Sequence, residues 1–218
     1  MSTSERDVSP DRPLSGSTIN GATLWRKYRR DAEIFGEGEP ANSVYQVISG
    51  AVRTVKLLPD GRRQIASFVL PGDIFGIEQD IYQHTAEATI PSAIWVAGRS
   101  KLFAELPNVL ELVIRNLERA ENHVLLLGRQ NAIEKVTVFL IEMDRRLQSP
   151  NVLTLPMTRR DIADYLGLTH ETVTRVLAVL CQNGLLGISG KTGREIALHH
   201  RLELAELARA SSALALKL

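Results

Sequence analysis

The chain has 218 residues, of which 44% are hydrophobic and 5% aromatic, with 26 Lys and Arg against 25 Asp and Glu. This length suits one large domain or two ordinary ones, and the formal net charge of +1 means that any nucleic-acid surface must be local. The single cysteine, Cys181, excludes an intrachain disulfide framework and any zinc or iron–sulfur centre that needs several thiolates from one chain.

The N-terminal stretch, residues 1–21, is rich in Ser, Pro, Asp and Gly. Such a composition buries too little apolar surface to offset the entropy lost on ordering, so we expect a disordered tail. The stretch also lacks the basic segment and apolar run of a signal peptide. No apolar run in the chain approaches the roughly 18 residues of a membrane span. We therefore expect a cytoplasmic protein that makes no membrane contact.

Residues 22–106 consist of short apolar runs separated by the turn sequences Ser49-Gly50, Pro59-Asp60-Gly61 and Pro71-Gly72-Asp73. Strand-like runs about ten residues apart, with turn residues between them, predict an all-β barrel or roll. Pro59-Asp60-Gly61 indicates a hairpin, because proline presets φ and glycine accepts a positive φ. We expect one further strand across residues 85–96. A jelly-roll of this kind encloses space, so it could hold a ligand.

Residues 107–131 change to a helical period that begins at Pro107, whose fixed φ suits a helix start. Apolar residues then recur at alternating spacings of three and four, which is typical of a coiled-coil seam. The seam residues are Leu110, Val113, Leu117, Ala120, Val124 and Leu127, with Asn131 as a polar residue at the end. We interpret this seam as the dimerisation helix of a homodimer. The alternative is a helix that packs on its own β-roll.

Residues 132–218 are predicted to form a C-terminal domain, with residues 128–134 as the hinge before it. A helix that ends near residues 148–150 is indicated by the apolar face of Ile133, Val136, Phe139, Leu140 and Met143. The whole chain is thus expected to have an α+β fold, with a β-roll, a long helix and a helical C-terminal domain in that order.

The sequence TRRDIADYLGLTHETVTRVL, which begins at Thr158, predicts two short helices joined by a tight turn. Thr158 and Thr169 are suited to cap the two helices, and Gly167 to end the first one. Such a pair is a helix-turn-helix, whose second helix enters a major groove. The outward positions of that helix, which we predict to contact bases, are His170, Glu171, Thr174 and Arg175. Glu171 and Arg175 are four residues apart and could form an ion pair that orients the guanidinium.

Two short strands around Gly190-Lys191-Thr192-Gly193 predict a β wing after the helix-turn-helix. Basic and hydroxyl side chains near such a wing and at helix starts are suited to DNA phosphates. We expect phosphate contacts from Thr158, Thr169, Thr172, Lys191 and Arg194.

This order of β-roll, seam helix and winged helix-turn-helix resembles the CRP/FNR superfamily of dimeric bacterial transcription regulators over residues 22–200. The resemblance also rests on the roll glycines Gly50, Gly61, Gly72 and Gly76. The string DIADYLGLTHETVTRVL is similar to the FNR and FixK branch, whose E-x-x-S/T-R pattern maps onto Glu171, Thr174 and Arg175. The resemblance implies a homodimeric activator that works with RNA polymerase at an inverted repeat close to TTGAT-N4-ATCAA.

The signal that such a regulator senses depends on its β-roll. Oxygen-sensing members of the superfamily hold an iron–sulfur cluster through N-terminal cysteines, and this chain has none there. Cyclic-AMP binders use a glutamate and an arginine, whereas here Glu78 is displaced by one position and His84 stands in the arginine's place. The resemblance to FixK-type proteins implies microoxic or nitrogen-fixation control without a cofactor or small-molecule effector. The alternative is a CRP-like sensor gated by a cyclic nucleotide or by haem.

Cys181 lies near the end of the second helix of the helix-turn-helix. It could be a small, partly buried hydrophobe or an oxidation switch, although a helix C-terminus disfavours a thiolate. The sequence contains no nucleophile elbow, phosphate loop, metal quartet or paired-carboxylate motif. We therefore predict that the chain is not an enzyme and binds no metal.

Overall fold

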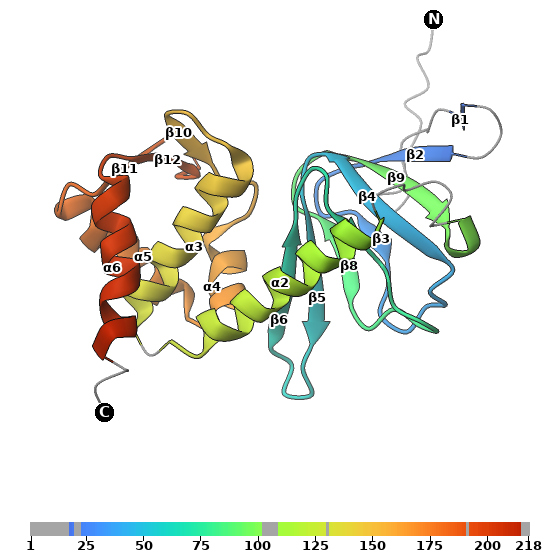
Figure 1. Ribbon diagram of the computed structural model, residues 1–218, viewed down its shortest axis with the longest axis horizontal. Coiled ribbons are helices and arrows are strands. Elements are labelled where there is room, and N and C mark those ends of the chain that lie inside the picture. The colour runs from blue at the N-terminus through green and yellow to red at the C-terminus, as the bar shows by residue number, and fades with distance from the viewer. Residues whose placement is uncertain (1–17, 20–22, 102–108, 130, 191, 215–218) are drawn as a thin grey trace, which may run out of the picture. The chain divides into compact units, whose positions relative to one another are not determined.

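The computed structural model describes residues 18–19, 23–101, 109–129, 131–190 and 192–214 (Figure 1). The chain divides into two compact units, which are Met1–Leu57 with Ala66–Asn116 and Leu58–Ile65 with Leu117–Leu218. Two residues of the predicted tail form strand β1 (Thr18–Ile19), which pairs with β2 (Thr23–Tyr28). The rest of that tail lies outside the described residues.

The first unit is a β-roll made of two sheets, as the sequence predicts. Their strand orders are β1-β2-β9-β4-β7 and β3-β8-β5-β6, and the pairs β2–β9, β4–β9 and β5–β8 are antiparallel. The other strands are β3 (Glu33–Phe35), β4 (Ser43–Ser49), β5 (Val52–Leu57), β6 (Arg63–Val69), β7 (Ile74–Phe75), β8 (Thr85–Ala88) and β9 (Ser92–Gly98), and the short 3-10 helix η1 (Arg99–Lys101) follows.

The single strand expected across residues 85–96 was wrong, because the chain forms β8 and β9 there with a turn between them. Pro91 lies in that turn, and a proline cannot donate a hydrogen bond to a strand ladder. Thr89 holds the turn to the roll, with its backbone N–H donating to the carbonyl of Ala51 at 2.9 Å.

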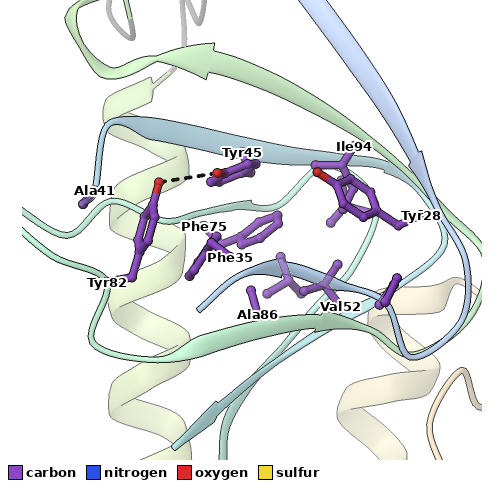
Figure 2. Packing of buried hydrophobic residues seen from close by; sticks show 13 residues of the cluster. Tyr28, Phe35, Ala41, Tyr45, Val52, Phe75, Tyr82, Ala86 and Ile94 are labelled. Atoms are coloured by element: carbon purple, nitrogen blue, oxygen red, sulfur yellow. Dashed lines mark hydrogen bonds between the residues drawn. The ribbon is translucent and has the colours of Figure 1, made fainter. Parts of the chain in front are cut away.

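Aromatic rings fill the interior of the roll (Figure 2). Phe35 stacks on Tyr82 with ring centroids 3.7 Å apart, and the centroid of Tyr45 lies 5.2 Å from those of both Phe35 and Phe75. Gly76 allows this packing, since its φ is +73° and a Cβ there would lie 2.8 Å from Cδ2 of Tyr45. The core of the roll is therefore closely packed with its own side chains.

Helix α2 (Val109–Leu127) packs on the roll through its first turns and has large apolar side chains exposed elsewhere. Leu112 and Val113 pack against a cluster of the roll that includes Val44 and Ile74. The exposed large apolar side chains of α2 are Leu110, Ile114, Leu117, Val124 and Leu125. Among the predicted seam residues, Val113 and Leu127 are partly buried, while Ile114, which the prediction does not include, is exposed. Ala120 is exposed as predicted.

The seam does not continue to Asn131, so that part of the prediction was wrong. Helix α2 ends at Leu127, and Asn131 is the N-cap of α3 (Ala132–Leu147), its Oδ1 accepting a hydrogen bond from the backbone N–H of Ile133 at 2.9 Å. At the N-cap position, an asparagine in the extended conformation can accept a hydrogen bond from a free N–H of the helix start. Inside a helix, the same side chain competes with the backbone hydrogen bonds. The break between the helices falls within the predicted hinge.

The second unit contains the predicted helices and wing. Phe139, Leu140 and Met143 of α3 are each 1% exposed, and α3 packs against α6 (Figure 1). Helix α6 and the third strand of the wing sheet, whose order is β10-β12-β11, were not predicted from the sequence. The remaining elements are β10 (Val152–Thr154), α4 (Arg159–Leu166), α5 (His170–Gln182), β11 (Leu186–Ser189), β12 (Glu195–Leu198) and α6 (Arg201–Leu214).

Candidate nucleic-acid interface

The first helix of the helix-turn-helix, α4, begins with a complete capping box. The Oγ1 of Thr158 accepts a hydrogen bond from the backbone N–H of Asp161 at 3.1 Å, and the carboxylate of Asp161 accepts from the backbone N–H of Thr158 at 2.9 Å. Gly167 ends the helix with a left-handed φ of +62°. These caps confirm the predicted ends of α4 and fix the turn that leads to α5.

The second helix, α5, is oriented by its buried side. Val173, Leu177 and Leu180 are each at most 2% exposed. Thr169 caps the helix, because its Oγ1 accepts a hydrogen bond from the backbone N–H of Thr172 at 3.1 Å. The predicted phosphate contacts Thr169 and Thr172 thus lie at the start of α5, where free N–H groups and the helix dipole favour an anion.

Three of the four predicted base contacts, His170, Glu171 and Arg175, are exposed on α5. The fourth, Thr174, is only partly exposed. Its Oγ1 is buried and has no hydrogen-bond partner among the described residues. The exposed surface of Thr174 therefore lies on its other atoms, which include the methyl group.

The ion pair that we expected between Glu171 and Arg175 is absent from the described part of the chain. Instead, a hydrogen bond with its own backbone N–H and then one with the hydroxyl of Thr169 lower the pKa of Glu171 below the usual range. A free helix N-terminus attracts a first-turn carboxylate. Arg175 is exposed on α5, and it has no ion pair with a carboxylate among the residues that the structure describes.

Two of the predicted phosphate contacts, Lys191 and Arg194, belong to the wing. Lys191 lies outside the described residues, and Arg194 is half-buried, its carbonyl accepting from the backbone N–H of Leu155 at 2.9 Å. Gly193 has a φ of +62°, and a Cβ there would lie 2.9 Å from Nη2 of Arg159. The Arg159 side chain therefore lies directly against the wing turn.

Arg159 and Arg160 were not predicted as site residues, although both directly follow the cap Thr158. Arg160 is exposed and lines a surface hollow of about 540 Å³ together with Thr169, His170 and Glu171. The sequence signal that could have identified these two residues is a pair of adjacent arginines at the start of a helix-turn-helix.

Arg63, which was not predicted as a site residue either, contacts α4. Arg63 is the first residue of β6, and the segment Leu58–Ile65 that contains it belongs to the same compact unit as α4. Its Nη2 donates to Oδ1 of Asp161 at 2.8 Å and its Nε to Oδ2 of Asp164 at 2.8 Å. Although partial burial opposes the shift, these two carboxylates raise the pKa of Arg63 above its usual value. Sequence spacing gave no indication of this contact, because about 100 residues separate the partners.

Cys181 is partly buried at the end of α5, beside the wing. Burial raises the pKa of its thiol, and the charge of Arg159 and a hydrogen bond from the backbone N–H of Ile188 oppose that shift without cancelling it. The thiol form is thus favoured at neutral pH, and thiols react with oxidants more slowly than thiolates do.

Neither a metal centre nor a membrane span is seen in the residues that the structure describes. No group of three or more His, Cys, Asp or Glu side chains is arranged there to hold a metal ion. Among the same residues, no helix is both long enough and apolar enough to cross a bilayer.

Comparisons with known families agree with this two-part architecture. Residues 25–107 match the cyclic nucleotide-binding domain, and residues 134–207 match the Crp-like helix-turn-helix domain. The first match covers β3 to β9 and most of β2, and the second covers most of α3, both helices of the helix-turn-helix and all three strands of the wing sheet.

Relatives extend the agreement to most of the chain. The nitrogen fixation regulation protein FixK of Rhizobium meliloti (strain 1021) is 39% identical over 80% of this chain and 83% of its own length. The protein of the same name from Azorhizobium caulinodans is 42% identical over 83% and 77%. The solved structure of FixK2 from Bradyrhizobium japonicum has a TM-score of 0.78 and 46% identity, covering 89% of this chain and 98% of that one. The chain therefore belongs to the CRP/FNR superfamily of transcription regulators, within its FixK-like branch, and is a DNA-binding regulator, not an enzyme.

Proposed function

We propose that this protein is a homodimeric, cytoplasmic activator of transcription that reads a palindrome close to TTGAT-N4-ATCAA in microoxic or nitrogen-fixation control. The observation that carries the proposal is the exposed face of α5, where His170, Glu171 and Arg175 project from a helix capped by Thr169. A guanidinium can donate two hydrogen bonds to guanine, and a carboxylate can accept one from cytosine. The methyl group of Thr174 is suited to a thymine methyl.

Phosphate contacts would come from both sides of this helix. We assign them to Thr158, Thr169 and Thr172 at the helix starts and to Lys191 and Arg194 of the wing. Arg160 joins this set, because it is exposed in the same hollow as Thr169 and His170. Such contacts hold the protein in register but carry no sequence information.

Pairing of two chains is supported by the exposed apolar side chains of α2. Leu117 is 59% exposed and Val124 is 68% exposed, and they lie seven residues apart on one side of the helix. Large apolar side chains in such a stripe are costly in water, and a second α2 would cover them. A dimer would place two recognition helices roughly 34–36 Å apart, matching the two halves of a palindrome.

Action without an effector is supported by the filled interior of the roll, in which Phe35, Tyr45, Phe75 and Tyr82 pack on one another (Figure 2). Contact with RNA polymerase is proposed for the exposed turn at Asp60-Gly61, by analogy with the superfamily alone.

Binding to the palindrome is the direct test. A labelled duplex that carries TTGAT-N4-ATCAA should bind the purified protein at least about a thousandfold more tightly than a duplex with the same bases scrambled. Equal affinity for both duplexes at several salt concentrations would show that α5 does not read this sequence.

A ligand-gated sensor is the second candidate, and one observation favours it. Oε2 of Glu78 is buried and has no hydrogen-bond partner among the described residues, while Oε1 lies 3.8 Å from Nδ1 of His84. A ligand hydroxyl could supply the missing hydrogen bond. Titration calorimetry with cyclic AMP and an absorbance spectrum of the purified protein distinguish the candidates, since heat of binding or a haem band would support the sensor.

A further inference from the structure

The guanidinium of Arg63 contacts one turn of α4 at two points. Nη2 lies 2.8 Å from Oδ1 of Asp161, and Nε and Nη2 lie 2.8 Å and 2.6 Å from Oδ2 of Asp164. The two aspartates are three residues apart, so they share one face of the helix. Because a guanidinium is planar and rigid, it fixes the direction of its partners as well as their distance.

The two carboxylates differ in their need for a partner. The side chain of Asp161 is 1% exposed, whereas that of Asp164 is 21% exposed. Asp161 uses Oδ2 for the capping box with Thr158 and Oδ1 for Arg63. A buried carboxylate is costly unless it is both paired and hydrogen-bonded. Arg63 therefore places a counter-charge against the buried carboxylate that closes the capping box of α4.

The neighbouring arginine, Arg62, behaves differently. Its side chain is 78% exposed, and its Nε donates to Oδ2 of Asp60 at 2.7 Å, within the same turn. Two adjacent arginines of equal charge thus have separate partners, one on α4 and one local. Arg62 provides a control that has the same charge and nearly the same position in the sequence.

We propose that Arg63 is a positioning residue for DNA reading. By holding Asp161 and Asp164 it fixes α4, and α4 packs against the reading helix α5. Arg63 needs no contact with DNA for this role, since its guanidinium already binds two carboxylates. The segment Leu58–Ile65 thereby keeps the helix-turn-helix ready for DNA without a ligand. This inference rests on the proposed function.

The test compares Arg63→Gln with Arg62→Gln in the full-length protein. Dissociation constants for the TTGAT-N4-ATCAA duplex and a scrambled duplex are measured by fluorescence anisotropy over a range of salt. We expect Arg63→Gln to weaken palindrome binding roughly tenfold, a typical size for coupling through a second site. The salt slope and the affinity for the scrambled duplex should not change, because no phosphate contact is lost. Arg62→Gln should stay within about twofold of the parent.

Other results would overturn the positioning role. A salt slope reduced by about one, with both duplexes weakened alike, would make Arg63 a phosphate contact. An equal loss in Arg62→Gln would assign the effect to charge alone. Arg63→Lys should recover part of the lost affinity, since the charge remains while the two-pronged geometry is lost. No recovery at all would contradict a role for the charge pair.

Hydrogen exchange of the free proteins tests the contact without DNA. We expect residues 159–166 of α4 to exchange faster in Arg63→Gln than in Arg62→Gln, with residues 132–147 of α3 unchanged. Unchanged hydrogen exchange in α4 overturns the proposal. Faster exchange in both α3 and α4 would mean that Arg63 stabilises the unit as a whole and does not position α4 in particular. If the parent does not bind the palindrome but α4 loosens as expected, the proposed function fails and the contact stands.

Discussion

His123 and Tyr165 stack face to face, with ring centroids 3.8 Å apart and planes 2° from parallel. The Nε2 of His123 also lies 2.8 Å from the backbone carbonyl of Tyr165, so this nitrogen is the one that donates. The pair joins α2 to α4 within the second unit, at a hollow of about 330 Å³ that α3 also lines. Tyr165 is thus held on both its ring and its backbone.

Tyr165 gives a prediction for alkaline pH. Burial raises its pKa from 10.0 to about 12, while the charge of Arg146 opposes and that of Glu142 adds to the shift. A raised pKa contributes stability that is fully present below pH 10 and is lost as pH rises through about 12. We expect the difference in unfolding free energy between the parent and Tyr165→Phe to shrink by about 2 kcal/mol over that window. Denaturant titrations of both proteins at fixed pH values measure this difference. A difference in unfolding free energy that stays constant from pH 10 to 12 would contradict the raised pKa of Tyr165.

The capping box of α4 predicts a loss of stability in Thr158→Ala. The change removes the acceptor for the backbone N–H of Asp161 and the hydroxyl that donates to its carboxylate. Loss of such a cap costs about 1 kcal/mol. Urea unfolding measures this, with the exposed Thr192→Ala as the control. Equal urea midpoints of unfolding for Thr158→Ala and Thr192→Ala would show that the cap contributes nothing to stability.

Arg175→Ala tests the base contact on α5. We expect it to cost ~1–3 kcal/mol of binding to the palindrome and to relax selection at one base pair. Competition among duplexes with single substitutions shows both effects. Arg145→Ala removes the same charge from α3, where Arg145 pairs with Glu142, and should not alter the sequence preference. A variant that keeps both affinity and preference would place Arg175 outside the groove.

Leu117→Lys tests the α2 seam. A charged side chain at an exposed apolar position of the stripe should oppose pairing and give a monomer that does not bind the palindrome. Light scattering after size exclusion gives the mass. Glu118→Lys introduces the same side chain at the adjacent exposed position and should still form a dimer. A dimeric Leu117→Lys that binds DNA normally would refute the seam.

Cys181→Ser tests the oxidation switch. The raised pKa of the thiol disfavours fast reaction with peroxide, so we expect the parent and the variant to respond alike. DNA binding before and after brief peroxide treatment is the measurement. Loss of DNA binding after peroxide treatment in the parent, but not in Cys181→Ser, would establish Cys181 as a redox-sensitive residue.

Local patterns in the sequence were sufficient for the order of β-roll, long helix and helix-turn-helix and for the orientation of α5, but not for α6 or for β10. Caps such as Thr158 and Thr169 and turn residues such as Gly167 act over a few residues, so their effect is visible in the sequence. The periodicity of α2 gave the helix but not its rotation. Val113 packs inward because the roll offers Val44 and Ile74, which a helical period alone cannot show.

Contacts between distant segments were not predictable in this way. Arg63 and Asp161 are 98 residues apart, and an isolated arginine in a turn resembles any solvated one. The predicted pair of Glu171 with Arg175 failed for a different reason. Its spacing was correct, but the free N–H groups at the start of α5 competed for the same carboxylate.

The exposed stripe of α2 has a consequence for dosage. If DNA is bound only by paired chains, then at low concentration the number of pairs rises with the square of the number of chains. A twofold rise in synthesis would give about fourfold more of the binding species. A regulator that is controlled by its own abundance would therefore switch its promoters more sharply than its expression level changes, with no allosteric ligand involved.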